Sequence, residues 1–298
     1  MARLTLGPIL FHWPARQKLD FYARIADEAP IDTVYLGEVI CSKRAPFFER
    51  HHAEVAERLE RGGKKVVFST LAEVMLPRER RAMAELCAEE GFEIEVNDSS
   101  ALLYLSGRGH RIGALMNTYN EETMTYLAER GASHFALPAE LPRAAIEILG
   151  RHANRLGVGL EVQVFGRASL ALSARCYHAR AHGRIKDNCQ FVCEEDPDGM
   201  PLTTLAGERF LAVNGIQTLS HSYLNLLPEL NDMVGIGVTD FRLTPHSQDM
   251  VAVATLFRQN LNGRLPADEA LERLKGLHIP APFCNGFWKG RPGHVWVR

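Results

Sequence analysis

The chain alternates short β-rich runs with amphipathic helical patterns over most of its length. The β-rich runs are Leu4–Phe11, Thr33–Leu36, Lys65–Thr70, Glu93–Val96, Arg111–Met116, His134–Leu137, Gly159–Val164 and Ile236–Phe241. Strands that alternate with helices indicate βα units whose strands run parallel to one another. Eight such units in 298 residues predict an α/β fold, a (β/α)8 TIM-like barrel. An open, doubly wound sheet is the alternative architecture.

Helical patterns separate the first seven runs. They cover Leu19–Ala29, Phe48–Arg61, Pro77–Glu90, Glu121–Arg130 and Pro142–Leu156, and a further one covers Met250–Gln259. Pro77 and Pro142 stand where a helix would begin, and a first-turn residue needs no backbone N–H. These patterns support the barrel, because strands that alternate with helices form parallel βα units.

One long interval, between the seventh and eighth strands, breaks the alternation. We expect a single barrel domain, 1–298, in which 167–222 form an insertion and 265–298 form a C-terminal tail. Short β-like runs at 190–192 and 210–213 predict a small β layer in the insertion. The tail carries aromatic and basic residues at 287–291, which we expect to pack on the barrel; a binding edge is the alternative.

Four of the six cysteines are placed to hold a metal centre. Cys176, Cys189 and Cys193 lie in the insertion, and Cys41 follows the second strand. Both segments leave the carboxyl ends of barrel strands, which is the face that carries function in such barrels. Four thiolates are the usual ligands of a [4Fe–4S] cluster, which is therefore the first hypothesis for these residues.

Zinc is the alternative metal for this region. His178 and His182 are four residues apart, so with Cys189 and Cys193 they would complete a closed tetrahedral zinc site. Four cysteines around one zinc ion are a further possibility. The radical-enzyme loop, which has a third cysteine three positions after the second, fails because Asp196 occupies that position.

Cys87 falls on the apolar face of a helical pattern and is expected in the core, and Cys284 lies in a C-terminal loop.

The remaining features exclude several classes of function. A net charge of −2 gives no bulk attraction to nucleic acid or to an anionic membrane. No apolar run has membrane-spanning length, and no secretory signal is evident, so we expect a cytoplasmic protein. Nucleotide-binding glycine motifs, a serine nucleophile elbow and a His-Glu-x-x-His helix are missing from the sequence.

The seventh strand carries the residues of a family resemblance. The run Glu161–Leu170, followed by Cys176, resembles the signature of the collagenase-like peptidase (U-thirty-two) family. Within that family, Gly37–Arg44 and the spacing of the insertion cysteines are similar to the members that act in anaerobic ubiquinone biosynthesis. Asn97-Asp98 after the fourth strand also fits, and the likeness covers nearly the whole chain.

The resemblance implies a [4Fe–4S] cluster on Cys41, Cys176, Cys189 and Cys193. It implies a heterodimer with a homologous subunit, together with a lipid-binding accessory protein. The implied activity is O2-independent hydroxylation of the prenylated aromatic ring of ubiquinone precursors. A collagenase-like peptidase, and a non-catalytic scaffold with a structural metal site, remain the alternatives.

Several polar residues are expected on the same face of the barrel. These candidate catalytic residues are His12, Lys43, Arg44, Asn97, Asp98, Glu161 and Arg167. Lys43 and Arg44 would tune the potential of a neighbouring cluster or hold an anionic oxygen donor. Solvated loop charges, and for Glu161 a structural role, are the alternative interpretations.

Overall fold

The structure is a computed structural model that describes residues 2–105 and 107–297. Met1, the first residue of the expected domain, and Arg298, the last residue of the expected tail, lie outside the described residues. No described helix combines the length and the apolar character that crossing a lipid bilayer requires.

Eight parallel strands form a closed barrel, as the alternation predicts. They are β1 (Arg3–Leu6), β2 (Thr33–Leu36), β3 (Lys65–Ser69), β4 (Glu93–Val96), β5 (His110–Ile112), β6 (Ala132–Ala136), β7 (Gly159–Leu172) and β11 (Asp240–Leu243). Each of the first seven pairs with the next, and β11 pairs with both β1 and β7. This double pairing closes the barrel, so the open-sheet alternative is wrong.

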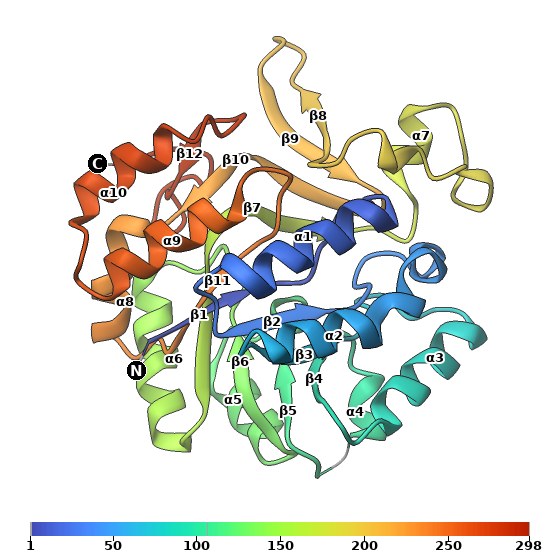
Figure 1. The fold of residues 1–298 in the computed structure, drawn as a ribbon, viewed down its shortest axis with the longest axis horizontal. Helices are drawn as coiled ribbons and strands as arrows, with labels where there is room; N and C mark the ends of the chain where they lie inside the picture. Colours follow the sequence, from blue (N-terminus) through green and yellow to red (C-terminus); the bar gives the residue numbers. More distant parts are fainter. Residues whose placement is uncertain (1, 106, 298) are drawn as a thin grey trace.

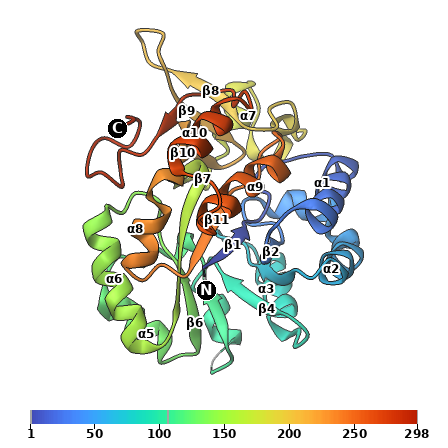
Figure 2. The same cartoon turned by 60° about the vertical axis from the view of Figure 1, so that its left-hand side comes forward.

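Helices surround the barrel (Figures 1 and 2). They are α1 (Ala15–Glu28), α2 (His52–Arg61), α3 (Pro77–Ala88), α4 (Ala101–Tyr104), α5 (Glu121–Ala128), α6 (Arg143–Leu156), α8 (Leu230–Gly235), α9 (Met250–Leu261) and α10 (Ala267–Lys275). Figure 2 shows α5, α6 and α8 on one side of the strands, with α1, α2 and α3 on the other. α2, α5, α6 and α9 contact the barrel strands, whereas α10 packs on α9. The buried stripes of these helices are those of amphipathic helices.

An extra β layer and a short helix extend one end of the barrel. The layer consists of β8 (Met200–Thr203), β9 (Arg209–Asn214) and β10 (Gln217–Asn225), and the helix is α7 (Tyr177–Ala181). β10 pairs antiparallel with the second half of β7 and with β9, and parallel with β12 (Phe283–Cys284) near the C-terminus. Figure 1 shows this yellow and orange part of the chain above the barrel.

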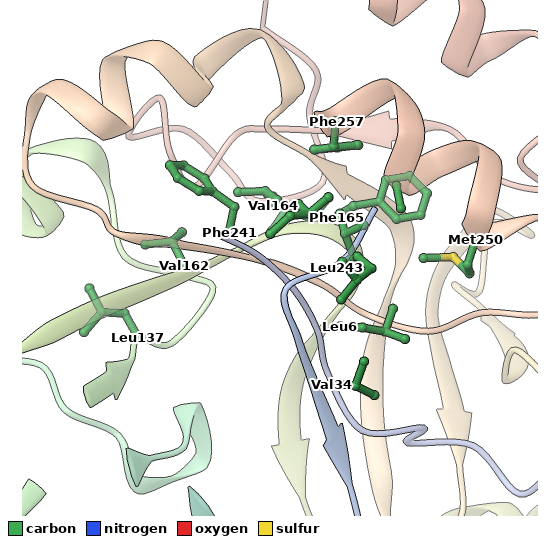
Figure 3. Close-up of a cluster of buried hydrophobic side chains, with 14 of the residues drawn as sticks. Leu6, Val34, Leu137, Val162, Val164, Phe165, Phe241, Leu243, Met250 and Phe257 are labelled. Carbon is green, nitrogen blue, oxygen red and sulfur yellow. The ribbon is translucent and has the colours of Figure 1, made fainter. Parts of the chain in front are cut away.

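The apolar core lies between the barrel wall and its covering helices. Figure 3 shows Phe165 and Leu243 of the barrel packed towards Met250 and Phe257 of α9. Phe165, Leu243 and Phe257 are each 0% exposed. Burying a side chain of this size contributes roughly 1.5–3 kcal/mol to stability, so this contact fixes α9 on the barrel.

Short 3-10 helices lie in the loops between these elements. They are η1 (Ser42–Phe47) and η2 (Glu49–His51) after β2, η3 (Ala114–Met116) after β5, η4 (Lys186–Asn188) and η5 (Val192–Glu194) after α7, and η6 (Leu227–Glu229) before α8.

The predicted strand at 190–192 is wrong. Gln190 and Phe191 have φ of +50° and +54°, which no strand allows.

Candidate metal centre

The four cysteines expected to act together line one small cavity. Cys41 lies between β2 and η1, Cys176 caps the start of α7, Cys189 follows η4, and Cys193 lies in η5. The cavity that they share measures about 20 Å³. Figure 1 shows how the loop after β2, in blue, approaches the α7 segment, in yellow. Residues 135 positions apart in sequence therefore meet at the carboxyl end of the barrel.

Glu38 and Gly37 shape the segment that carries Cys41. The Oε1 atom of Glu38 accepts hydrogen bonds from the backbone N–H groups of Ile40 and Cys41, both at 3.0 Å. Gly37 has φ of +125°, and a Cβ there would lie 2.4 Å from the carbonyl oxygen of Ser69. Only glycine fits this position, so the chain turns from the end of β2 towards the cavity.

No three of the cysteine sulfur atoms are gathered as closely as a single zinc ion needs. Among the described residues, which include all six cysteines, no three Sγ atoms lie within 4.8 Å of one another. A tetrahedral zinc ion with Zn–S bonds of about 2.3 Å needs sulfur atoms roughly 3.8 Å apart. An iron–sulfur core holds its thiolates further apart, because its four irons lie between them. An all-cysteine donor set is the one that such a core takes.

Two cations lie against the thiols. Lys43 Nζ is 3.8 Å from Cys189 Sγ and donates to the carbonyl oxygen of Lys186 over 2.6 Å. Arg44 is 1% exposed and donates to the carbonyl of Leu10. A positive charge beside sulfur favours the thiolate that a metal requires. Lys43 and Arg44 both line the cavity of the four cysteines.

Burial sets the protonation of the thiols in the absence of metal. It raises the pKa of Cys41, Cys176 and Cys193, while Arg44 opposes this rise at each of them. Burial also raises the pKa of Cys87 to about 11 and that of Cys284 to about 12. Cys87 lies in the core, as expected, and Cys284 is 2% exposed in β12. Neither of these two cysteines lines the cavity.

His12 lies on the same side of the barrel as the cysteines. Its ring is 1% exposed and contacts the rings of Phe47 and Phe191, with centroids 5.3 and 5.6 Å away. Its Nε2 is 3.4 Å from a carboxylate oxygen of Glu194. Burial, helped by the charge of Arg44, lowers the pKa of His12 to about 4. The imidazole is therefore neutral at pH 7.

Glu161 and Asn97 belong to the barrel interior. Glu161 accepts from Tyr35 Oη at 2.8 Å and from Arg242 Nη2 at 2.7 Å, and it is fully buried. Burial alone would raise its pKa, but Arg242 reverses this and lowers the pKa of Glu161. Asn97 and Arg242 line a cavity of about 70 Å³ at the mouth of the barrel. Glu161 is therefore held by side chains of the barrel interior, and Asn97 lines the cavity at the barrel mouth.

Arg167 and Asp98 brace loops instead. Arg167 donates to the carbonyl oxygen of Asp198 over 2.9 Å and to that of Ser220 over 3.0 Å, which joins β7 to the insertion. Asp98 accepts from the backbone N–H of Ser100 at 2.8 Å and so forms a turn. Neither residue lines the cysteine cavity or the cavity at the barrel mouth.

Asn214 and Gly215 were not singled out from the sequence. Asn214 Nδ2 donates to the carbonyl oxygens of Cys193 and Asp196, at 2.9 and 2.8 Å. Gly215 lines the cysteine cavity, and a Cβ there would lie 2.3 Å from Arg44 Nη2. An Asn-Gly pair between two β-rich runs is a hairpin signal, and that signal was available in the sequence.

A larger apolar pocket adjoins the cysteine cavity. It measures about 500 Å³ and lies between η1, α2 and α3, where Phe68, Met83 and Leu86 form part of its wall. Lys43 and Phe191 line both spaces. Pockets of this size and composition bind small organic molecules. Only the side chains of Lys43 and Phe191 would therefore separate a bound molecule from the cavity of the thiols.

The alternative zinc set of His178, His182, Cys189 and Cys193 is not brought together within ligand distance. The group that the structure gathers within 4.8 Å is His178, His182 and Asp196 instead. His178 is fully buried and also lines the cysteine cavity. The histidines and the cysteines thus form neighbouring but different donor sets.

Comparisons with known proteins found two similarities. A sequence profile described as peptidase family U32 matches residues 21–296. A crystal structure of an uncharacterized B. cereus protein is similar over 82% of this chain, at 8% identity and with a TM-score of 0.38. The chain spans 61% of the length of that protein.

Proposed function

Because the chain belongs to peptidase family U32, we propose that it is the iron–sulfur subunit of an O2-independent hydroxylase within that family. Its substrate is the prenylated aromatic ring of ubiquinone precursors. It acts as UbiV proteins do, paired with a homologous subunit of the UbiU type and assisted by a lipid-binding protein of the UbiT type. The observation that carries the proposal is the single cavity lined by Cys41, Cys176, Cys189 and Cys193.

Each of the four cysteines supplies one thiolate to a [4Fe–4S] cluster. When bound, such a cluster accepts and returns single electrons. Four protein ligands leave no iron open for substrate, so this chain contributes electron transfer to the hydroxylation. The oxygen comes from a donor other than O2. Lys43 and Arg44 stabilise the negative charge of the thiolates, and the surrounding apolar residues Val39, Ile40 and Ile216 exclude water.

The apolar pocket beside the cavity supports a hydrophobic substrate. Phe68, Met83 and Leu86 give it a surface on which an aromatic ring or an isoprenoid chain packs. Lys43 and Phe191 form the shared wall between the pocket and the thiols. A ring in this pocket would lie close enough to the thiols for electron transfer through that wall.

The test compares two single substitutions in protein purified without oxygen. Cys41→Ser removes one proposed ligand, whereas Cys87→Ser alters a buried thiol away from the cavity and serves as the matched control. We expect wild type and Cys87→Ser to be brown, absorbing at about 400 nm, and Cys41→Ser to lose most of its iron. Equal iron content in the two variants would remove Cys41 from the ligand set.

The same protein preparations distinguish the hydroxylase subunit from a peptidase and from a non-catalytic scaffold. A peptidase would hydrolyse peptides whether or not iron is present, and the hydroxylase subunit would not. A scaffold would support hydroxylation regardless of the cluster potential. Hydroxylation in the reconstituted complex should instead follow that potential in folded variants.

A further inference from the structure

Three metal-ligand side chains gather beside the cysteine cavity without a cysteine among them. His178 lies in α7, His182 directly follows α7, and Asp196 lies between η5 and β8. One ligand atom from each lies within 4.8 Å of the other two. The three residues come from two separate segments, α7 with the residue after it and the loop between η5 and β8, which the fold brings together.

Backbone carbonyls orient both imidazole rings. His178 Nδ1 lies 3.2 Å from the carbonyl oxygen of Val213, and His182 Nδ1 lies 3.0 Å from that of His178. A carbonyl oxygen only accepts, so each Nδ1 carries the proton and each Nε2 keeps a free lone pair. The two rings are parallel within 2°, with centroids 5.2 Å apart. Metal-binding histidines are held in this way by their second nitrogen.

Among the residues that the structure describes, the Nε2 atom of His178 finds no hydrogen-bond partner, although its side chain is fully buried. It lies 3.0 Å from Oδ2 of Asp196, at an angle that forms no hydrogen bond. A lone pair and a carboxylate oxygen at this distance repel each other unless a cation lies between them. Two ligand atoms at about 2.1 Å from one ion, at an angle of 90–109°, would lie roughly 3.0–3.4 Å apart. The observed distance falls at the lower end of that range.

We propose that His178, His182 and Asp196 bind a divalent first-row transition-metal ion, at a site separate from the four cysteines. Imidazole nitrogen suits iron, zinc, nickel and copper, and two histidines with one carboxylate leave coordination positions open. Asp196 is 28% exposed, so water or a small anion reaches those positions. The ion would also connect α7, whose N-cap residue is Cys176, to the segment that follows Cys193.

Cobalt(II) is the probe for this site, because its absorption distinguishes nitrogen and oxygen ligands from thiolates. The full chain, purified without oxygen and then treated with a mild chelator, is titrated with Co²⁺. Wild type should bind one Co²⁺ per chain without an intense thiolate-to-cobalt band in the near ultraviolet. Asp196→Asn and His182→Gln should each weaken binding at least 10-fold and leave the iron content unchanged. His152→Gln, on α6, is the control and should bind as wild type does.

Three results would overturn the site. Wild type that binds no Co²⁺ would leave His178 and Asp196 as a structural ion pair only. Equal affinity in wild type and Asp196→Asn would exclude the carboxylate. A strong thiolate band, or loss of Co²⁺ binding in Cys41→Ser while Asp196→Asn still binds, would assign the ion to the cysteines. Because the iron content is read separately, failure of this site does not alter the result for the cluster.

Discussion

Arg44 Nη2 donates a hydrogen bond to Oδ1 of Asn214 over 2.7 Å, between two residues that are both buried. Asn214 in turn donates to the backbone of the segment that carries Cys193. This relay connects the loop of Cys41 to the loop of Cys193 without using either thiol. The geometry of the cavity therefore depends on residues that bind no metal.

Gly215→Ala should disturb this relay, because its new Cβ would lie 2.3 Å from Arg44 Nη2. Gly183→Ala is a matched control, since its φ of +65° is close to the +67° of Gly215 and a Cβ there has no heavy atom within 4 Å. Both variants carry the backbone cost of alanine at positive φ, about 1–2 kcal/mol. Gly215→Ala should lose about 1–3 kcal/mol more in urea unfolding. Equal losses would show that Arg44 moves aside without cost.

Lys43→Gln should lower the reduction potential of a bound cluster. Its ammonium lies 3.8 Å from Cys189 Sγ, and a nearby positive charge favours the more negative, reduced state. The shift should be on the order of tens of millivolts in a redox titration, with the iron content unchanged. Lys64→Gln, before β3 at the opposite end of the barrel, should leave the potential as it is. An unchanged potential in Lys43→Gln would show that Lys43 serves the loop alone.

Glu161→Gln should destabilise the barrel by about 3 kcal/mol, because it leaves buried Arg242 with a single carboxylate partner, Glu95. The lowered pKa of Glu161 also makes stability depend on pH. Below about pH 4.3 the unfolded chain takes up the proton first, so stability falls as pH drops towards the folded pKa. This contribution is fully present above that pH. Urea unfolding between pH 3 and 7 should therefore show a shallower acid loss in the variant, and parallel curves would contradict this role.

Ala82→Trp should fill the apolar pocket beside the thiols. Ala82 lines that pocket on α3, whereas its exposed neighbour Arg81 does not and provides the control Arg81→Trp. We expect binding of a short-chain prenylated phenol, measured by titration calorimetry, to weaken at least 10-fold in Ala82→Trp only. Iron content should be the same in both variants. Equal binding by both would place the substrate elsewhere, for example on the partner subunit.

The barrel was predictable because its signals are local. β2 and β4 have the bounds that their sequence patterns predict. β1 ends at Leu6 instead of Phe11, since Pro8 has no N–H to continue the ladder. β11 begins at Asp240 instead of Ile236, because the chain first turns at Gly237, with φ of +100°. β7 continues to Leu172 through its pairing with β10, a partner about 50 residues away that a local pattern does not reveal.

The candidate site likewise contains residues that local sequence patterns reveal and residues that only the fold brings together. The cysteines were identified because thiols in a chain without expected disulfides need another explanation. In the sequence, Asp196 stands only where a radical-enzyme motif needs a cysteine, yet in the structure its carboxylate lies 3.0 Å from His178 Nε2. The side-chain amide of Asn214 donates a hydrogen bond to the backbone carbonyl of Cys193, which is 21 residues away in the sequence. Such contacts depend on how the loops pack against one another, so the spacing of residues in the sequence does not predict them.

The most direct test is a count of iron, acid-labile sulfide and zinc per chain in wild-type protein isolated without oxygen. The account predicts about four irons and about four sulfides per chain, as expected of a four-thiolate cluster. One stoichiometric zinc, with neither iron nor sulfide, would contradict it.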